Sequence, residues 1–279
     1  MSTYQKLVGE FELDLETAVS KAQKGDKKAL EVVITTIQDK IYYLALRMLC
    51  NPEDAKDAAQ EILILIVTKL STFQFRSKFT TWVYRVSANY LLDTKKNFEK
   101  DLEITFDDFK QDLESDLVDP TDLKNSPEYP LLLNELRIMC TVAMLMCLDK
   151  KHRLAYIIGD IFELNHSEAS EILSLSKENY RKQLSRARLK VINFTKNSCG
   201  LVDDCASCHC DKKLAGAIKR TRINKNYICF ADKSEETYTQ VKESIAELAE
   251  DLRTVYLQNA IPFLKFPVNF IKTLESIDT

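Results

Sequence analysis

Side chains that donate hydrogen bonds crowd one segment of the chain, residues 176–188. Arginine, lysine, asparagine and serine donors suit phosphate oxygens and the edges of DNA bases. The candidate contacts are Lys177, Asn179, Arg181, Lys182, Ser185, Arg186 and Arg188. This composition favours nucleic-acid binding, and the alternative is a surface helix whose charges are only solvated.

A helix is needed to hold these donors on one side, and the apolar pattern predicts one. Apolar residues recur every three or four positions, as a buried helix face requires. They are Tyr180, Leu184, Ala187 and Val191. A shorter helix capped by Ser167 is expected before it, and a turn at 174–175 leads to Ser176, the cap of the second helix. The two helices and their turn predict a DNA-reading helix-turn-helix.

A second group of candidate contacts interleaves aromatic and basic side chains around a helix predicted to begin at Thr80 or Thr81. Aromatic rings stack on unpaired bases while cations hold the backbone in single-stranded nucleic-acid binding. The group comprises Phe75, Arg76, Lys78, Trp82, Arg85 and Asn89. The alternative is that Trp82 anchors a core and the cations are solvated.

Two further helices are predicted before this group. One apolar stripe extends from about Asp26 to Leu49. Asn51 is a good cap and Pro52 suits a first turn, so a second helix is expected from there to about Leu70. Its polar face is largely acidic and includes Asp57, Gln60 and Glu61.

The composition predicts an all-helical protein that binds DNA poorly by itself. The 279 residues include only five glycines and six prolines, which favours long helices in two or three domains. The net charge of -3 is unlike that of a free-standing nucleic-acid binder, so a partner complex is expected to supply much of the attraction for phosphate. We expect no enzyme, because the sequence has no glycine-rich phosphate loop, zinc-binding histidine pair or nucleophile elbow.

The N-terminus lacks an apolar signal core, and no apolar run reaches the roughly 20 residues of a membrane span. We therefore expect a cytoplasmic protein without a membrane segment. In that reducing compartment the eight cysteines are not expected to form a disulfide framework, and Cys50, Cys140 and Cys147 fit small buried thiols.

Three segments in order resemble the bacterial RNA polymerase sigma factors of the extracytoplasmic-function (ECF) class, over roughly Leu15 to Lys196. Residues 51–61 resemble the family's polymerase-clamp-binding helix, and residues 73–89 resemble its promoter-melting loop and helix. Residues 184–188 match the Leu-x-Arg-Ala-Arg end of its helix-turn-helix. The resemblance implies a transcription initiation factor that works as part of a polymerase holoenzyme.

The resemblance also implies a role for each candidate surface. Asp57, Gln60 and Glu61 would bind the clamp helices of core RNA polymerase. The group from Phe75 to Asn89 would engage the opened minus-ten element of the promoter, where a base leaves the stack. The second helix of the helix-turn-helix would read the minus-thirty-five element, with Arg181 and Arg186 as the favoured contacts. An anti-sigma protein is a further partner to look for.

The sequence departs from the family pattern at three positions. Phe75 stands where the family often has glycine, and Glu178 and Tyr180 replace smaller residues near the start of the recognition helix. The promoter sequence therefore does not transfer from the family to this chain.

Residues 98–129 are rich in Asp and Glu with few cations, which predicts a flexible acidic linker. The simple interpretation is a solvated tether, although in the resembled family the equivalent segment threads toward the polymerase active centre, so that the acidity could mimic nucleic acid. We expect a sigma region 2-like domain at 1–97 and a region 4-like helix-turn-helix domain at 130–196. A cysteine-containing extension is expected at 197–279.

The extension opens with a run of cysteines between residues 199 and 210, which indicates metal or redox chemistry. Cys205 and Cys208 have the spacing that lets two thiolates share a tetrahedral zinc ion. The proposed zinc set is Cys199, Cys205, Cys208 and Cys210, with Cys229 as an alternative fourth ligand. Thiol redox sensing and unligated cysteines stay open, and His209 is expected to be a neighbour rather than a ligand.

One long helix is predicted from a cap at Ser234 to about Leu257, and the apolar tail from Phe263 to Leu274 is expected to fold back. The extension is expected to pack against its own chain; a partner or dimer surface, or control of access to the DNA and polymerase surfaces, is the alternative. Two other functions stay open for the whole chain: a stand-alone helix-turn-helix regulator, and a metal- or redox-responsive interaction protein.

Overall fold

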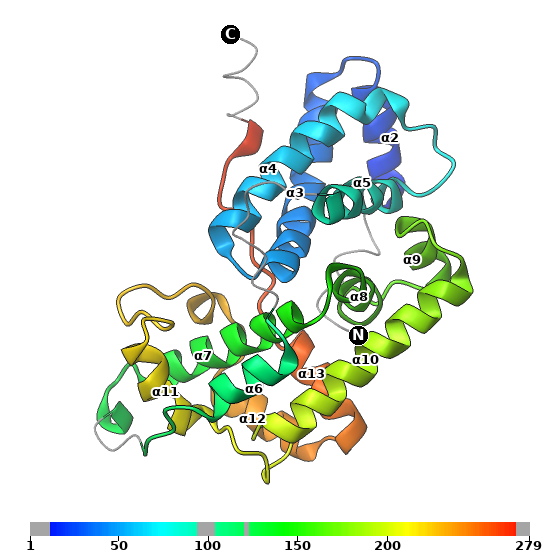
Figure 1. Cartoon of the computed structure of the whole chain (residues 1–279). Helices are drawn as coiled ribbons and strands as arrows, with labels where there is room; N and C mark the ends of the chain where they lie inside the picture. Colours follow the sequence, from blue (N-terminus) through cyan, green and yellow to red (C-terminus); the bar gives the residue numbers. More distant parts are fainter. Residues whose placement is uncertain (1–11, 94–103, 120–122, 272–279) are drawn as a thin grey trace. The chain divides into compact units, whose positions relative to one another are not determined.

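The computed structural model describes residues 12–93, 104–119 and 123–271, and these residues form helices joined by loops, with no strand among them (Figure 1). The prediction of an all-α fold is confirmed. The helices divide into two compact units: residues 1–100, 157–182 and 263–279 in one, and residues 101–156 and 183–262 in the other. The four sequence-ordered domains remain a prediction, and the compact units cut across them.

The first unit is built on two long antiparallel neighbours, α3 (Lys27–Leu49) and α4 (Pro52–Lys69), preceded by α2 (Glu12–Ala22). Asp26 caps α3 by accepting from the Ala29 N–H at 3.1 Å. Asn51 caps α4 by accepting from the N–H groups of Glu53 and Asp54, and Pro52 occupies the first turn. Both predicted helices are therefore confirmed, and so is the cap at Asn51.

The first unit is completed by α5 (Phe79–Asp93), by the π-helical turn η4 (Ile157–Ile161), by α9 (His166–Ile172), and by the tail after Phe263. The tail folds back as predicted: Phe266 donates its N–H to Asp39 at 2.8 Å, and its ring lies 5.7 Å from that of Tyr42. Phe270 is buried. Leu274, the last residue of the predicted tail contact, lies outside the described residues.

The second unit surrounds α7 (Tyr129–Met144), which packs against α11 (Cys210–Lys219), α12 (Tyr238–Glu247) and α13 (Glu250–Asn259). The segment 129–147 is long and apolar enough to cross a membrane, but most of it is buried in this unit. Its leucines share one apolar cluster with Leu214 and Val241, so it is the central core helix. The 3-10 turn η3 (Leu145–Cys147) and α8 (Lys150–Tyr156) follow it.

Two sequence predictions are wrong in the second unit. The single helix expected from Ser234 to Leu257 is two helices, because Leu248 and Ala249 have extended backbone and Arg253 donates to the Leu248 carbonyl at 3.1 Å. The flexible linker contains a helix, α6 (Phe106–Glu114), and a 3-10 turn, η2 (Leu123–Asn125). A capping box between Thr105 and Asp108 starts α6.

Candidate nucleic-acid interface

The predicted helix-turn-helix consists of α9, a turn at 173–176 and α10 (Lys177–Ser198). Ser174 lies in the left-handed region at φ 54°, and Leu175 donates to the Ser170 carbonyl at 2.9 Å, which closes the turn. Ser176 caps α10 as predicted, since its hydroxyl accepts from the Asn179 N–H at 3.2 Å. The cap of α9 is Asn165, not Ser167, because the Asn165 side chain accepts from the N–H groups of Ser167 and Glu168.

The two faces of α10 separate as the sequence predicts. Its buried positions are Tyr180, Leu184, Ala187 and Val191. All seven candidate DNA contacts are exposed: Lys177, Asn179, Arg181, Lys182, Ser185, Arg186 and Arg188. Lys182 pairs with Glu178 at 2.6 Å, and Arg181 donates to Nδ1 of His166 at 3.1 Å. The helix therefore presents a continuous row of donors to solvent.

The second group of candidates forms an aromatic cluster at the start of α5. The Trp82 ring lies 5.5 Å from Phe73 and 5.6 Å from Phe79, which is buried. Trp82 itself is partly exposed. Trp82 therefore packs on a core and leaves part of its ring exposed, so its core role is seen and base stacking stays a prediction.

The loop before α5 contains a residue in an unusual backbone conformation. Phe75 has a φ of 55°, in the left-handed region that favours glycine. Its ring is 44% exposed and lies 4.8 Å from that of Phe73. The chain thus keeps a glycine-like backbone at this position and adds an exposed aromatic ring, next to exposed Arg76.

Two cations of this group are paired with acids of α9 inside the first unit. Arg85 donates to the Glu171 carboxylate at 2.8 Å and to the Glu171 carbonyl at 3.1 Å. Lys78 pairs with Glu168 at 3.2 Å. The structure therefore brings Lys78 and Arg85 against α9, while Asn89, one turn along α5 from Arg85, is exposed. No pattern in the sequence pointed to the acids of α9 as their partners.

The acidic patch lies on the solvent side of α4. Asp57 and Glu61 are exposed and Gln60 is half-buried, so the three side chains occupy adjacent turns of one face. Burial raises the pKa of Tyr90 on α5, and the negative charges of Glu61 and Asp57 raise it further. The patch therefore extends to Tyr90, which sequence reasoning did not assign to it.

The four candidate zinc ligands differ in their exposure to solvent. Cys205 is exposed, whereas Cys208 and Cys210 are buried and Cys199 is partly buried. Cys199 and Cys208 face each other across an isolated parallel bridge, in which the Gly200 N–H donates to the Cys208 carbonyl at 2.8 Å. Among the residues that the structure describes, no three His, Cys, Asp or Glu side chains are arranged to hold a metal ion. As they stand, the four cysteines do not form a zinc site.

Buried thiols gather around the start of α11 instead. Cys199, Cys210 and Cys140 of α7 belong to one apolar cluster. Burial, with a smaller contribution from neighbouring Cys199, raises the pKa of the Cys208 thiol to about 12. Burial also raises the pKa values of Cys199 and Cys210. These thiols are protonated at neutral pH, which opposes thiolate reactivity.

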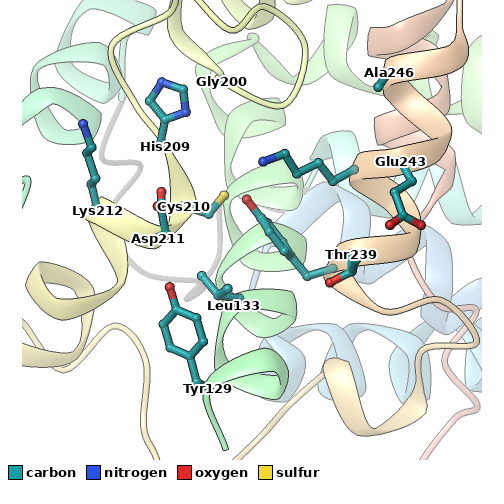
Figure 2. Close-up of a pocket in the computed structure, with 12 residues that line it drawn as sticks. Tyr129, Leu133, Gly200, His209, Cys210, Asp211, Lys212, Thr239, Glu243 and Ala246 are labelled. Carbon is teal, nitrogen blue, oxygen red and sulfur yellow. The ribbon is translucent and has the colours of Figure 1, made fainter. Parts of the chain in front are cut away.

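A cavity of about 620 Å³ opens beside this cluster (Figure 2). Cys210 and His209 line it from the start of α11, Tyr129 and Leu133 from α7, and Glu243 from α12. The His209 ring packs on Gly200, where a β-carbon would come within 2.5 Å of its Nδ1 atom. His209 thus packs against Gly200, and its expected place outside a zinc site stays a prediction.

Comparison with known proteins gives a family match at residues 33–97, which fit the model of sigma-70 region 2. The match covers α4, the aromatic loop and α5. It therefore includes both the acidic patch and the aromatic-cationic group described above.

Curated relatives match across a longer stretch. The ECF RNA polymerase sigma factor SigW of Bacillus subtilis is 27% identical over 185 residues, which cover 64% of this chain and 95% of that protein. The RNA polymerase sigma-H factor of Pseudomonas aeruginosa is 29% identical, over 61% of this chain and 88% of its own length. The ECF sigma-E factor of Escherichia coli K12 is 26% identical, over 64% and 92%.

One solved structure is similar over much of the chain, that of CnrH in complex with the cytosolic domain of CnrY. The TM-score is 0.44 at 17% identity, and the match covers 62% of this chain and 92% of the other.

Proposed function

We propose that this chain is an RNA polymerase sigma factor of the ECF class that directs the polymerase to promoters, and we assign one surface to each step. The observation that carries the assignment is the match of residues 33–97 to sigma-70 region 2, together with relatives whose lengths the chain covers almost fully. A stand-alone regulator is disfavoured by the same matches.

The acidic patch on α4 is our proposed contact with core RNA polymerase. Asp57 and Glu61 are one helical turn apart and exposed, and Gln60 lies beside them. Opposite charges on the partner would be attracted at low cost, since these carboxylates need little desolvation before binding. A polymerase partner also accounts for the net charge of -3, because the polymerase can supply phosphate attraction that this chain lacks.

The start of α5 is our proposed contact with the opened minus-ten element. The exposed ring of Phe75 and the partly exposed ring of Trp82 can stack on bases, and Arg76 and Arg85 can hold the backbone. Unstacking one base costs a few kcal/mol, and stacking on an aromatic ring returns about 1–3 kcal/mol. Asn89 adds an amide that can pair with a base edge.

The exposed face of α10 is our proposed reader of the minus-thirty-five element in the major groove. Arg181 and Arg186 are the favoured base contacts, because a guanidinium pairs in bidentate fashion with guanine. The remaining donors of α10 would hold phosphates and fix the register of the helix.

Core binding tests the first contact directly. We expect the charge-reversed variant Asp57→Lys with Glu61→Lys to lose affinity for core RNA polymerase by at least about tenfold, as measured by fluorescence anisotropy of labelled protein. Glu16→Lys with Glu31→Lys, which changes two exposed carboxylates of α2 and α3, is the charge-matched control. Equal binding by wild type and the α4 variant would contradict the assignment.

We propose that the protein is cytoplasmic, that it performs no catalysis of its own, and that the polymerase contributes the active site. An anti-sigma protein stays a prediction, tested by identifying proteins that co-purify with the tagged chain from its source cells.

A zinc ion in the extension also stays a proposal, and it would require Cys205 and its neighbours to rearrange. Elemental analysis of protein purified under reducing conditions tests it. One equivalent of zinc that is lost in Cys208→Ser but retained in Cys50→Ser would support the site. Metal-free protein that is folded and active would contradict it.

A further inference from the structure

The second unit contains the cavity of about 620 Å³ that none of the proposed DNA and polymerase surfaces uses (Figure 2). Its walls come mainly from α7, from the start of α11 and from α12, and every residue that lines it belongs to the second unit. Sites for small molecules commonly have volumes of about 300–1,000 Å³. The cavity is therefore large enough for a small organic ligand.

Part of the cavity wall is aromatic and apolar. Tyr129 and Leu133 lie one turn apart on α7, and Tyr238 and Ala246 line the cavity from α12. The Tyr238 hydroxyl forms a hydrogen bond with the Cys210 thiol, which orients the tyrosine ring. Aromatic rings attract one another in offset-stacked and edge-to-face arrangements. The wall therefore favours a ligand with a flat apolar body.

Two lysines bring positive charge to the same cavity. Lys212 lines it from α11 and Lys242 from α12, and both residues are exposed. Asp211 and Glu243 line it as well, so the charges of these four side chains balance. A further charge close to the cavity therefore decides which ligand it favours.

That charge is the buried guanidinium of Arg137, one turn beyond Leu133 on α7. Its Nε donates to Asn134 at 2.9 Å and its Nη1 to the Ala260 carbonyl at 2.6 Å, whereas its Nη2 has no hydrogen-bond partner among the residues that the structure describes. Arg137 is 1% exposed. Burial lowers the pKa of Arg137 to about 10, so the side chain stays charged at neutral pH.

Arg137 is close enough to the cavity to act on a ligand there. After burial, the charges that affect the pKa of Arg137 include those of Cys210 and Tyr238, which both line the cavity. The carboxylate of Glu236 also acts on it, and this carboxylate accepts from the Tyr256 hydroxyl at 2.7 Å. A buried charge is costly unless an opposite charge offsets it. The cavity therefore favours a ligand with a negative charge.

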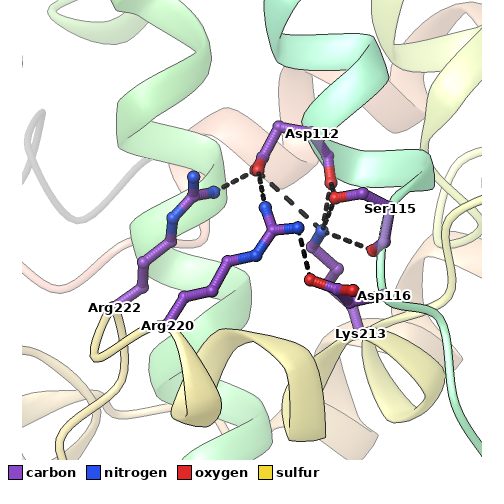
Figure 3. Close-up of polar contacts among 6 residues, drawn as sticks. All are labelled: Asp112, Ser115, Asp116, Lys213, Arg220 and Arg222. Atoms are coloured by element: carbon purple, nitrogen blue, oxygen red, sulfur yellow. Dashed lines mark hydrogen bonds and ion pairs between the residues drawn. The ribbon is translucent and has the colours of Figure 1, made fainter.

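The α11 wall of the cavity is held in place by α6 (Figure 3). Lys213 of α11 donates to the Ser115 carbonyl at 2.9 Å, and its side chain is only 5% exposed. Arg220 and Arg222, which follow α11, both pair with Asp112 of α6, the first at 2.8 Å. A wall that is already fixed lowers the cost of ordering on binding. The cavity is therefore pre-formed on this side.

We propose that the cavity between α7, α11 and α12 binds a small organic anion with an aromatic body. The body packs against Tyr129 and Tyr238, and the acidic group lies in the positive field of Lys212, Lys242 and buried Arg137. A carboxylate or a sulfonate on an aromatic ring system has this chemistry. The site is additional to the proposed sigma-factor function and does not depend on it.

Two dyes with one ring skeleton separate the acidic group from the aromatic body. Anilinonaphthalene sulfonate carries a negative charge, and N-phenylnaphthylamine has the same rings without it; both fluoresce when they bind apolar surroundings. The experiment titrates each dye into the full-length protein at low salt. We expect one saturable site for the sulfonate dye on the wild type.

A charge variant tests the preference for an anion. We expect Lys242→Gln to bind the sulfonate dye about two- to fivefold more weakly and the uncharged dye as tightly as wild type does. Lys219→Gln is the matched control, since Lys219 is an exposed lysine of α11 outside the cavity, and it should bind both dyes like wild type. Unchanged affinity for the sulfonate dye in Lys242→Gln, or an equal loss for both dyes, would overturn the proposal of an anion site.

A filling variant tests the location of the site. Ala246 is exposed at the cavity wall, so Ala246→Phe adds a ring there without changing a buried position. We expect both dyes to bind this variant at least about tenfold more weakly, with an unchanged circular dichroism spectrum. Equal binding by Ala246→Phe and wild type, or no binding of the sulfonate dye by wild type, would overturn the site. The titrations contain no polymerase and no promoter, so these results leave the sigma-factor function to its own test.

Discussion

Phe75 illustrates how one side chain can occupy a position that suits glycine. Its φ of 55° costs about 1–2 kcal/mol for a residue with a β-carbon. The exposed ring gains only a partial contact with Phe73, at 4.8 Å between centroids. Contacts within the protein therefore offset the backbone strain only in part. A base stacked on the exposed ring would give the strained conformation a function.

A matched pair of substitutions tests this backbone assignment. Both Phe75→Gly and Phe75→Ala remove the ring, but only glycine adopts the left-handed conformation without strain. We expect Phe75→Gly to be more stable than Phe75→Ala by about 1 kcal/mol in urea unfolding, a difference reduced somewhat by the flexibility of glycine in the unfolded chain. An alanine variant as stable as the glycine variant would show that Phe75 is not held in this region.

The buried thiols predict a loss of stability in alkali. The pKa of Cys208 rises from 9.0 in the unfolded chain to about 12 in the folded protein, because burial disfavours the thiolate. A raised acid pKa means that the stabilisation is fully present below pH 9 and is lost as the pH rises toward 12. We expect the free energy of unfolding to fall by about 1 kcal/mol between pH 9 and pH 10 from this thiol.

Cys208→Ala is expected to show a shallower decline over the same interval, whereas Cys205→Ala, at an exposed position, should follow wild type. Urea unfolding at a series of pH values measures both. Identical slopes for Cys208→Ala and wild type would contradict the burial of this thiol.

Local signals predicted the helices well where caps are strong. Asp26 and Asn51 each accept from the first turn that follows them, and both helices begin where the sequence indicates. The Thr105–Asp108 and Thr237–Gln240 capping boxes were equally readable, and they would have shown α6 and the start of α12. The break at Leu248 was not readable, because it depends on Arg253 reaching the carbonyls of Leu248 and of distant Val202.

The pairing of α5 with α9 links the proposed minus-ten contact to the first helix of the helix-turn-helix. Glu171 and Glu168 hold the same cations, Arg85 and Lys78, that are proposed to meet the minus-ten strand. Carboxylates at these positions compete with phosphates for the same cations. The pairs are partly exposed, so each contributes about 0.2–1 kcal/mol, and polymerase or DNA can displace them.

We therefore expect Glu168→Gln with Glu171→Gln to bind single-stranded minus-ten DNA about two- to tenfold more tightly than wild type at low salt. The gain should shrink at high salt, where ion pairs are screened. Fluorescence anisotropy with a labelled oligonucleotide measures it. The control is Glu163→Gln, which changes an exposed acid before α9. An equal gain in affinity in that variant would show that the effect comes from net charge and not from the ion pairs.

Across the whole chain, the candidate surfaces could be predicted from the sequence, whereas the ion pairs between distant residues could not. The exposed donors of α10 and the acidic patch of α4 follow from helical spacing and sequence chemistry, so a single sequence was enough to find them. The hold of Lys213, Arg220 and Arg222 on Asp112 joins positions about a hundred residues apart, which no local pattern encodes. The acidic segment looked like a solvated tether because its neutralising cations come from another part of the sequence.

The same long-range pairing explains how a chain with a net negative charge can carry basic surfaces. The net charge of -3 is a sum over a basic recognition helix and acids that are partly neutralised by contacts inside the protein. The distribution of charge over the surface, and not the net charge, decides which face of the protein binds phosphate.

The decisive test of sigma-factor function is to map the transcription start sites made by core RNA polymerase on fragments of the source genome. We expect new, discrete start sites when this protein is added, and their loss when Asp57, Gln60 and Glu61 are all replaced by alanine. Start sites that are the same with and without the protein, using matched polymerase and reduced protein, would contradict it.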